Sequence, residues 1–261
     1  MLSDKILQNL YILNLFIFVR IFMKKSLKKL VVLTGSGISA ESGLRTFREM
    51  GGLWEQYDVQ EVASPQGWAN NMDLVCRFYN ERRQQLLNAS PNRGHTTLAE
   101  LEQFFDVEII TQNIDNLHER SGSTKILHLH GELMKSRSTG DPSLVYDLDS
   151  WELNVGDKCE LGYQLRPHVV WFGEPVPLMD IAVRITNKAD IFAVIGTSLA
   201  VYPAAGLIAY VRANVPIYII DPNDLPLPHT KNIEFIKEVA SVGVPILKNK
   251  LLEKYYQNNK V

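Results

Sequence analysis

The sequence predicts an α/β fold, a Rossmann-like parallel sheet with helices on both faces plus a smaller insert lobe. Short apolar runs rich in Val and Ile recur along the chain, and helical patterns lie between them. Alternation of this kind is typical of a parallel sheet buried on both faces. The runs that we interpret as strands are Leu30–Leu33, Val107–Thr111, Ile191–Ile195 and Pro216–Ile220.

Two segments interrupt this alternation. Residues 51–95 look helical but polar, and residues 131–165 look irregular, with Gly, Pro, Asp and Ser throughout. Between them, Thr96–Phe105 has the apolar spacing of a helix that precedes the second strand. We therefore expect one domain over residues 24–254, with Rossmann-like parts at about 24–50, 96–130 and 166–254, a helical insert at about 51–95 and an insert lobe at about 131–165.

Composition describes an ordinary globular protein. The chain has 261 residues, 46% hydrophobic and 21% charged, with a net charge of -2. This near-neutral balance gives no electrostatic case for nucleic-acid binding, which usually needs a clustered basic surface. The two cysteines, Cys76 and Cys159, exclude a disulfide framework and favour a reducing, cytoplasmic location.

The first 23 residues differ from the rest. Leu10–Phe22 is apolar and lysines follow it, but no small-residue cleavage site of a secretory signal is present. As a membrane span the segment is short and is interrupted by Asn14 and Arg20. We expect residues 1–23 to be an extension outside the fold, with Met23 as the natural start. The alternative is a membrane anchor, and without it we expect no membrane association.

A glycine-rich loop follows the first strand. Residues 33–48 read LTGSGISAESGLRTFR, and the third glycine, Gly43, comes six residues after Gly37 instead of the three of a dinucleotide fingerprint. Gly35 and Gly37 allow a sharp turn whose N–H groups favour negative charge. The pattern alone predicts either a phosphate-binding loop or a tight strand-to-helix turn.

Polar residues follow the other predicted strands as well. Gln112, Asn113 and Asp115 follow the second predicted strand. The segment GTSLAVYPAAG (196–206) follows the third, and IIDPND (219–224) contains the end of the fourth and the residues after it. Ligands of open α/β sheets bind at this carboxyl edge. His128 and His130 of HLHG alternate, so in a strand they would face the same side. No third metal ligand stands at a recognisable spacing, so we favour a general base for one of them over a metal pair.

Together these stretches resemble the sirtuin family, and within it the bacterial protein deacylases that prefer acidic acyl groups. The matching motifs occur in the family's order over about residues 31–245, and several long motifs in one order are very specific. They are GSGISAESGLRTFR, GLWEQYDVQEVASPQGW, FYNERR, TQNIDNLHERSG, HLHGELMK, LRPHVVWFGE and IGTSLAVYPAAG.

The resemblance implies that the loop binds NAD for cleavage and not for hydride transfer, with the six-residue gap folded over the cofactor. Ser36 replaces the family's usual alanine, and residues 221–223 replace its usual Asn-x-Glu run. The implied cofactor-binding residues are Gly35, Ser36, Gly37, Glu41, Thr46, Phe47, Arg48, Trp54, Gln112, Asn113, Ile114, Asp115, Gly196, Thr197, Ser198, Asp221, Pro222, Asn223 and Ala240.

His130 and Asn113 are the implied catalytic residues. In the implied mechanism the acyl-lysine oxygen attacks the ribose carbon as nicotinamide leaves, and His130 then deprotonates a ribose hydroxyl. Neutral imidazole, with an ordinary pKa near 6.5, can accept that proton. From the residues alone, a hydrogen-bonded core histidine is the favoured interpretation of His130, and the resemblance is what favours the catalytic role.

Tyr79 and Arg82 lie three residues apart in a predicted helix and so share a face. A guanidinium and a phenol can bind a carboxylate together, and the pair resembles the family's succinyl- and malonyl-lysine selector. The alternative is a solvated arginine on a polar face. Ala63 leaves room for a longer acyl chain, and the other implied substrate-binding residues, which would sandwich the peptide through main-chain pairing, are Val170, Phe172, Gly173 and Val201.

Zinc is where the sequence departs from the family pattern. Structural zinc usually needs two Cys-x-x-Cys pairs. Between 131 and 165 there is only Cys159, followed by LGYQ, and Ser138 stands where a first ligand would be expected. We predict no zinc and no other metal site. We expect apolar contacts to hold this degenerate zinc lobe, through Leu144, Tyr146, Leu148, Trp151, Leu153 and Tyr163.

The resemblance therefore implies an NAD-dependent deacylase of acylated-lysine proteins, removing succinyl, malonyl and acetyl groups and producing nicotinamide and O-acyl-ADP-ribose. One alternative is an NAD-consuming ADP-ribosyltransferase or NADase, which has no use for the Tyr79–Arg82 pair. Another is a non-catalytic NAD or ADP-ribose sensor, which has no use for His130. An NAD-linked dehydrogenase fits the loop spacing worst.

Overall fold

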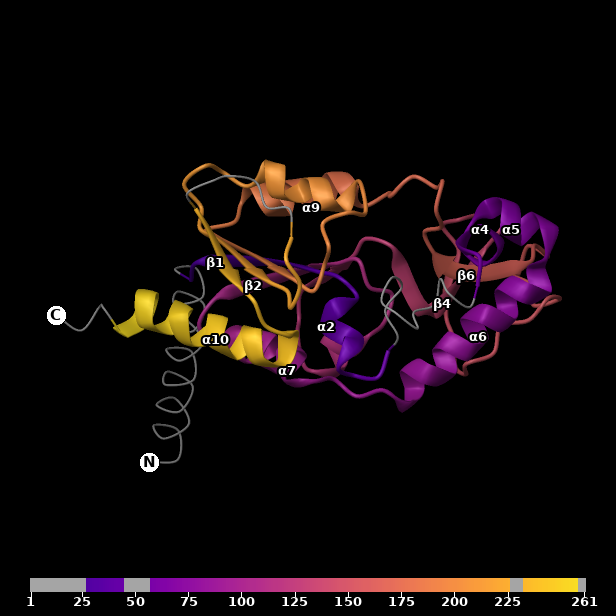
Figure 1. Cartoon of the computed structure of the whole chain (residues 1–261). Coiled ribbons are helices and arrows are strands. Elements are labelled where there is room, and N and C mark those ends of the chain that lie inside the picture. Colours follow the sequence, from indigo (N-terminus) through magenta and orange to yellow (C-terminus); the bar gives the residue numbers. More distant parts are fainter. Residues whose placement is uncertain (1–26, 45–56, 226–231, 258–261) are drawn as a thin grey trace, which may run out of the picture.

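The computed structural model describes residues 27–44, 57–225 and 232–257, which form two sheets at opposite ends of an elongated molecule (Figure 1). The larger sheet is parallel throughout, with the order β3-β2-β1-β7-β8-β9. Its strands are β1 (Lys29–Thr34), β2 (Asp106–Thr111), β3 (Ile126–His128), β7 (Ile191–Ile195), β8 (Ile217–Ile220) and β9 (Ile233–Ile236). The predicted α/β fold class is confirmed.

The strands of this sheet are apolar because helices cover both faces. Successive side chains of a strand point to opposite faces. Leu30 and Val32 of β1 pack with α7 (Arg93–Leu101) and α10 (Ala240–Leu252). Val31 and Leu33 pack on the other face with α9 (Met179–Asn187) and η1 (Ala204–Tyr210).

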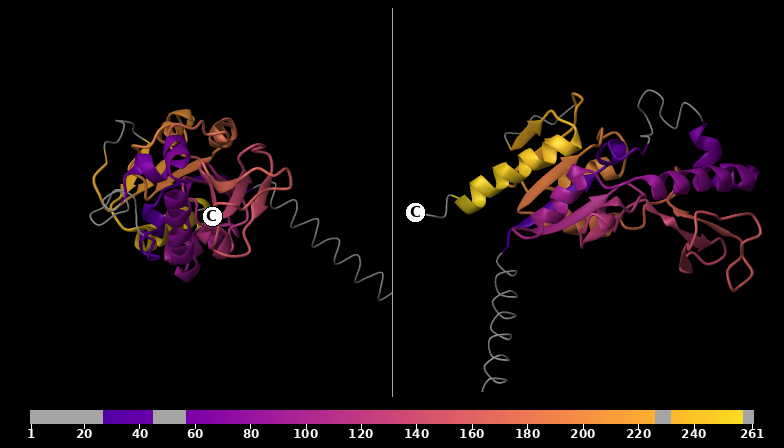
Figure 2. Two further views of the ribbon diagram at one scale, coloured as in Figure 1. Left: turned by 90° about the vertical axis from the view of Figure 1, so that its right-hand side faces the viewer. Right: turned by 90° about the horizontal axis from the view of Figure 1, so that it is seen from below.

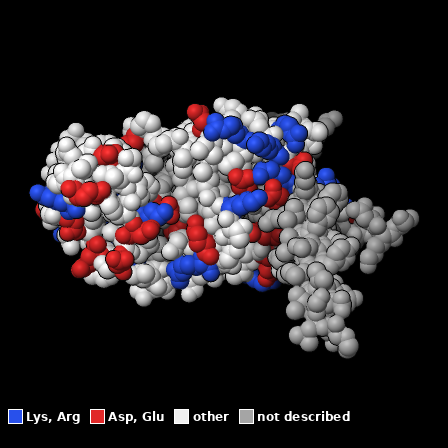
Figure 3. Space-filling view, turned by 180° about the vertical axis from the view of Figure 1, so that it is seen from behind, with Lys and Arg blue, Asp and Glu red and all other residues white. Residues whose placement is uncertain are grey.

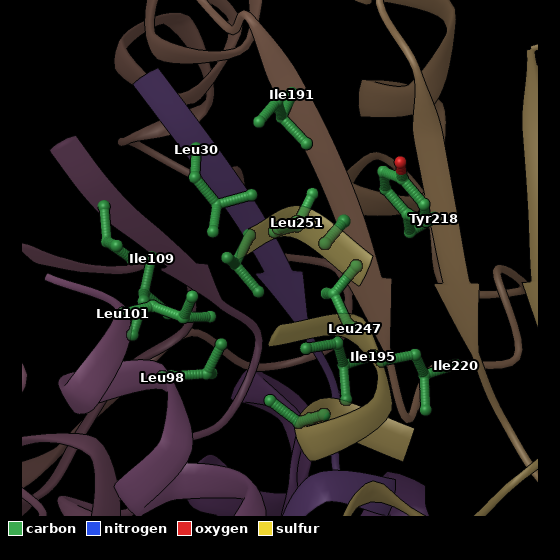
Figure 4. Close-up of a cluster of buried hydrophobic side chains, with 14 of the residues drawn as sticks. Leu30, Leu98, Leu101, Ile109, Ile191, Ile195, Tyr218, Ile220, Leu247 and Leu251 are labelled. Carbon is green, nitrogen blue, oxygen red and sulfur yellow. The ribbon is translucent and has the colours of Figure 1, made fainter. Parts of the chain in front are cut away.

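The core on the α7 and α10 side is closely packed (Figure 4). Leu98 and Leu101 of α7 and Leu247 and Leu251 of α10 converge on Leu30 and its neighbours, and all of them are fully buried. Each such side chain contributes about 1.5–3 kcal/mol by leaving water. Hydrophobic burial therefore fixes the sheet whose edge carries the polar residues.

The predicted helix Thr96–Phe105 is shifted toward the N-terminus in the structure, where α7 spans Arg93–Leu101. The side chain of Asn92 explains the earlier start, because its Oδ1 accepts the Gly94 N–H at 2.8 Å as an N-cap. The Asn92 amide also donates to the Ile38 carbonyl at 2.7 Å. The cap thus ties α7 to the segment that follows β1.

A smaller antiparallel sheet, with the order β5-β4-β6, lies at the other end of the molecule (Figure 2). Its strands are β4 (Gly131–Ser138), β5 (Val145–Asp147) and β6 (Leu165–Val169), and helices α4 (Val59–Val62), α5 (Pro65–Asn70) and α6 (Met72–Asn88) accompany it. Two expectations are corrected here: β4 is a strand, with a register shift between Gly131 and Ser136, within the segment predicted as irregular, and β6 joins this sheet instead of the Rossmann-like part.

Polar contacts, and not the predicted apolar ones, anchor this lobe. Of the six apolar side chains expected to hold it, only Leu153 is buried, while Tyr163 is 50% exposed. Arg83 of α6 is instead fully buried. It donates to the carbonyl oxygens of Trp151 at 2.7 Å and Leu133 at 3.2 Å, and to Asn80 Oδ1 at 2.6 Å. The Leu153 N–H also donates to Asn80 Oδ1, at 3.0 Å. We call Arg83 and Asn80 the α6 clamp.

Some predictions fall outside the described residues. They include the extension over residues 1–23, with its possible anchor, and Thr46, Phe47, Arg48 and Trp54. Within the ranges that are described, no helix has the length and apolarity needed to span a bilayer. Lysines and arginines lie among aspartates and glutamates on the face in Figure 3.

Candidate active site

Four neighbouring parallel strands, β2, β1, β7 and β8, end at one edge of the large sheet. Gln112, Gly35, Gly196 and Asp221 directly follow them. The chain continues from β1 to β2 on one side, and β7 lies on the other side, so the strand order reverses at β1. Ligands of open α/β sheets bind at such a switch point. The fold therefore brings together the strand-end residues that the sequence singled out.

The glycine loop is shaped by its neighbour. Gly35 and Gly37 donate their N–H groups to the carbonyls of Ile195 and Gly196, at 3.0 and 2.9 Å. A Cβ on Gly37 would lie 2.7 Å from Gly196 Cα, so the glycines are needed for the close approach of two loops. This corrects one expectation, because these two N–H groups are already bonded and do not face a phosphate.

Ser39 connects the loop to the end of β2. It lies in the short helix α2 (Gly37–Ala40), is buried, and donates its hydroxyl to Asp115 Oδ2 at 3.0 Å. The Asn113 amide donates to Ser39 Oγ at 3.2 Å and to the Gly35 carbonyl at 3.1 Å. Burial raises the pKa of Asp115 more than the Leu117 N–H and Ser39 hydrogen bonds lower it. Asn113 and Asp115 are therefore held in fixed positions.

The two histidines of HLHG have different environments. They do not share a strand, so the condition for facing the same side is not met: His128 ends β3, whereas His130 lies in the turn before β4. The His128 ring contacts the Asn113 carbonyl at 3.1 Å and Glu119 at 2.7 Å. Burial lowers the pKa of His128, but its bond to Glu119 outweighs this and leaves the pKa raised.

His130 contacts the Gln112 carbonyl through Nδ1 at 2.9 Å. Because a carbonyl only accepts, Nδ1 carries the proton and Nε2 holds the lone pair. Burial lowers the pKa of His130 more than this hydrogen bond raises it. A neutral imidazole with a fixed tautomer can act as a general base through Nε2.

A pocket lies between the glycine loop, the end of β2 and α6, and neither His128 nor His130 lines it. Arg82 faces the pocket together with the loop and the end of β2. Burial lowers the pKa of Arg82, while Tyr79 and Asp115 act in the opposite direction. The full lining is Ser36, Ser39, Leu44, Arg82, Gln85, Asn113, Ile114, Asp115 and Leu133.

Tyr79, one turn before Arg82, is buried, and its hydroxyl oxygen accepts a hydrogen bond from Trp171 Nε1 at 3.0 Å. Its pKa is raised to about 12, mainly by burial. The phenol therefore stays neutral at physiological pH. Tyr79 itself does not lie on a solvated face, since it is 3% exposed, whereas Arg82 is partly exposed.

The segment after β6 contains three predicted substrate-binding residues, Val170, Phe172 and Gly173, and contacts other predicted site residues. The Val170 N–H donates to the His130 carbonyl at 2.9 Å, and the Phe172 N–H donates to the Ala63 carbonyl at 3.0 Å. The Trp171 side chain between them reaches Tyr79. Val201 precedes η1, where its carbonyl accepts the Ala205 N–H, and Gly173 has a φ of +89°.

The remaining predicted cofactor residues extend along the same edge. Thr197 Oγ1 accepts the Gln112 amide at 3.2 Å, and Ser198 follows it. Asp221 is buried and accepts the Asn223 N–H at 2.9 Å, while Pro222 is exposed. Ala240 begins α10. Glu41 accepts both the N–H of Ser241, at 2.9 Å, and its hydroxyl, so this carboxylate already holds the start of α10.

The residues in the small lobe do not fit a zinc ion. At Cys-x-x-Cys spacing the four positions are Ser138, Asp141, Cys159 and Gly162, which supply one thiol. Ser138 Oγ already contacts Cys159 Sγ at 3.3 Å and accepts the N–H groups of Gly140 and Asp141 at 3.2 Å. Across the described ranges, no three His, Cys, Asp or Glu side chains gather as a metal site. The absence of zinc stays a prediction.

Several pocket residues escaped the sequence reasoning. Ser39 lies inside the glycine-rich loop, two residues after Gly37, so its position in the loop could have predicted it as a pocket residue. Gln85 lies three residues after Arg82, a spacing that places both on one helix face. Leu44 and Leu133 reach the pocket through tertiary packing, which no local pattern records.

The donor set at the strand ends fits a dinucleotide. The amides of Gln112 and Asn113, the carboxylate of Asp115 and the hydroxyl of Thr197 lie along one edge. The contact of Gly35 and Gly37 with Gly196 leaves no room for a Cβ, so no side chain projects from these glycines at that edge. Amide, hydroxyl and carboxylate groups suit the carboxamide, phosphates and ribose hydroxyls of such a ligand.

Known proteins match this chain over most of its length. The Sir2 family model matches residues 35–203. A Bacteroides thetaiotaomicron protein named NAD-dependent protein deacylase is 53% identical over 231 residues, which cover 87% of this chain and 99% of that protein. A mutant Sir2 homologue in complex with ADP-ribose superposes with a TM-score of 0.81 at 37% identity, covering 91% of this chain and 96% of that one. A Sir2 homologue in complex with NAD gives a TM-score of 0.79 at 37% identity, covering 88% and 91%.

Proposed function

The chain belongs to the Sir2 family, and from that premise we propose that it removes succinyl, malonyl and acetyl groups from lysine side chains of proteins. At the coarser level it is an NAD-dependent protein deacylase, the activity for which its relatives are named. The ADP-ribosyltransferase or NADase alternative and the sensor alternative are not favoured by these relatives. The preference for acidic acyl groups is the part that the following contacts support.

One observation carries the acyl preference: Arg82 lies in the same pocket as Ser36, Asn113 and Asp115. A guanidinium in a desolvated pocket gains most from a carboxylate, and its fork geometry matches one. The Tyr79 phenol lies one turn away and remains a hydrogen-bond donor. A succinyl or malonyl group offers that carboxylate, whereas an acetyl group does not.

His130 is the proposed general base, with Nε2 as the proton acceptor. Its Nδ1 proton is held by the Gln112 carbonyl, so the ring orientation and tautomer are fixed before any ligand arrives. When bound, NAD supplies the ribose that receives the acyl group and loses nicotinamide. Asn113, held by the Gly35 carbonyl and Ser39, is the proposed second catalytic residue.

The proposed cofactor residues are those of the glycine loop and the four strand ends. Among the described ones, Asn113 and Asp115 are the most rigidly held, whereas Glu41 already bonds α10. The acylated protein is proposed to pair with the segment containing Val170, Phe172 and Gly173. Both cysteines are unpaired, which supports the proposed cytoplasmic location.

Mass spectrometry of NAD reactions with succinyl-lysine and acetyl-lysine peptides tests the proposal. Arg82→Met should lower kcat/KM for the succinyl peptide about ten- to a hundredfold, because a charge-assisted pair is worth about 1.5–3 kcal/mol. The acetyl peptide should be affected much less. Arg77→Met is the matched control, since Arg77 is exposed on the same helix.

Other outcomes discriminate between the functions. Equal rates of wild type and Arg82→Met on the succinyl peptide would remove the acyl preference while leaving the deacylase activity intact. NAD consumption without deacylation of either peptide would support the transferase or NADase alternative. NAD binding with no turnover would support the sensor.

A further inference from the structure

Tyr79 has only part of its hydrogen-bonding capacity satisfied within the described residues. Its hydroxyl oxygen accepts a hydrogen bond from Trp171 Nε1 at 3.0 Å. An indole N–H can only donate, so the direction of this bond is certain. Among the described residues, the phenol O–H has no other recorded partner. The indole thus leaves the phenol with a proton to donate elsewhere.

The position of Trp171 is itself fixed from several directions. The guanidinium carbon of Arg166 lies 3.3 Å from the centroid of the Trp171 ring. The Glu174 carboxylate accepts a hydrogen bond from the backbone N–H of Trp171 at 2.8 Å. It also accepts two hydrogen bonds from the Arg166 guanidinium, at 2.6 and 3.1 Å. Arg137 adds two further contacts with Glu174, both at 3.3 Å. The ring of Trp68 packs against Trp171 with 5.7 Å between centroids.

Resting on the proposed acyl preference, we propose that Trp171 is a specificity-determining positioning residue. By occupying the acceptor side of the Tyr79 hydroxyl, it directs the phenol proton toward the carboxylate of a succinyl or malonyl group. The Arg166–Glu174 pair holds the indole in place for this purpose. A carboxylate offers only acceptors, so a phenol orientated as a donor complements it and has no equivalent partner on an acetyl group.

Trp171→Phe tests this because it keeps an aromatic ring and removes the indole N–H. The value of kcat/KM for a succinyl-lysine peptide should fall about three- to tenfold, the size of one neutral hydrogen bond. The loss should lie in KM, because the acyl carboxylate is bound equally in the ground and transition states. For an acetyl-lysine peptide kcat/KM should stay within about twofold.

Two further variants separate positioning from general damage to the cluster. Trp68→Phe shortens the neighbouring indole in the same apolar cluster and should leave the succinyl-to-acetyl ratio unchanged. In a Tyr79→Phe background, Trp171→Phe should have no additional effect on that ratio, because the hydroxyl that it positions is gone. Glu174→Gln, which keeps the shape of the side chain, should lower the ratio in the same direction but less.

Equal losses for both peptides, or a loss that persists undiminished in the Tyr79→Phe background, would overturn the inference. Arg82→Met is measured beside these variants. If Arg82→Met lowers the ratio and Trp171→Phe does not, only the role of Trp171 fails. If Arg82→Met leaves the ratio unchanged, the proposed acyl preference fails and this inference fails with it.

Discussion

The two sheets of this molecule are stabilised in different ways. β7 of the large sheet is apolar from end to end and β1 is apolar between Lys29 and Thr34, and helices bury both strands on both faces. The small sheet instead buries Ser136, Ser138 and Arg166, and its edge strand β5 is largely exposed. The large sheet is thus held by hydrophobic packing on both faces, whereas the half that contains the small sheet combines an apolar cluster with buried hydrogen bonds and ion pairs. His130 lies in the turn that connects a strand of one sheet to a strand of the other.

The largest expected effect comes from the residue at this junction. His130→Ala should lower kcat about a hundred- to ten-thousandfold on both succinyl and acetyl peptides, because the proton acceptor is removed. NAD binding, measured by calorimetry, should persist, since the cofactor edge is held independently by the large sheet. His168→Ala, a substitution in β6 of the small sheet, is the control and should retain activity. Retention of activity in His130→Ala would contradict the assigned base.

Removal of the α6 clamp should affect the half that contains the small sheet most strongly. Arg83→Met leaves the carbonyls of Trp151 and Leu133 without their donor and should cost about 2–4 kcal/mol of unfolding free energy. Hydrogen exchange should show the loss concentrated in β4 and residues 148–155, with the large sheet protected as before. Arg77→Met, which alters an exposed arginine of the same helix, should change stability by less than about 0.5 kcal/mol. Uniform loss of protection across both sheets would show that the two halves do not differ in this way.

A smaller effect is expected on acidification. Burial lowers the pKa of His130 below 6.5, so the base stays neutral and active until the pH falls below that value. As the pH is lowered, kcat/KM should therefore fall with a midpoint below pH 6.5, and this midpoint should be the same for succinyl and acetyl peptides. A midpoint above 6.5 would contradict the environment described for His130. A midpoint that differs between the peptides would show that the titrating group contacts the acyl group and is not His130.

The smallest expected effect is that of chelation. The donor set around Ser138 and Cys159 does not fit zinc, so a chelator should leave both the melting temperature and the deacylation rate unchanged. Elemental analysis of the purified protein should find substoichiometric zinc. One zinc per chain, lost together with stability on chelation, would show that a metal holds the small lobe after all.

The same contrast explains what the sequence could predict. Four of the six strands of the large sheet, β1, β2, β7 and β8, were located to within one or two residues, because burial on both faces leaves a mainly apolar run, whereas β3 and β9 were missed. β4 was missed because its sequence, GELMKSRS, is mostly polar. Its partners come from remote positions, such as Glu174 for Arg137 and Arg83 for the Leu133 carbonyl. Local patterns cannot record partners of this kind.

The site was predictable to a similar extent. Strand-end residues such as Gln112 and Asn113 stand where an α/β sheet requires them, so their grouping followed from the predicted strands. The bonding of the Gly35 and Gly37 N–H groups to the loop after β7 could not be anticipated, because it depends on the approach of two segments far apart in sequence. The turn between β3 and β4, which places His130 outside the strand that ends at His128, depends likewise on which sheet each strand joins.

The α6 clamp has a consequence for how the two halves can change during evolution. Arg83 and Asn80 bind main-chain atoms of Leu133, Trp151 and Leu153, so the clamp does not depend on which side chain stands at position 151. The clamp itself therefore places no requirement on the side chain at position 151, so we expect substitutions there to leave these hydrogen bonds in place. The cofactor edge has no such freedom, because a single added methyl group at Gly37 collides with the backbone of Gly196.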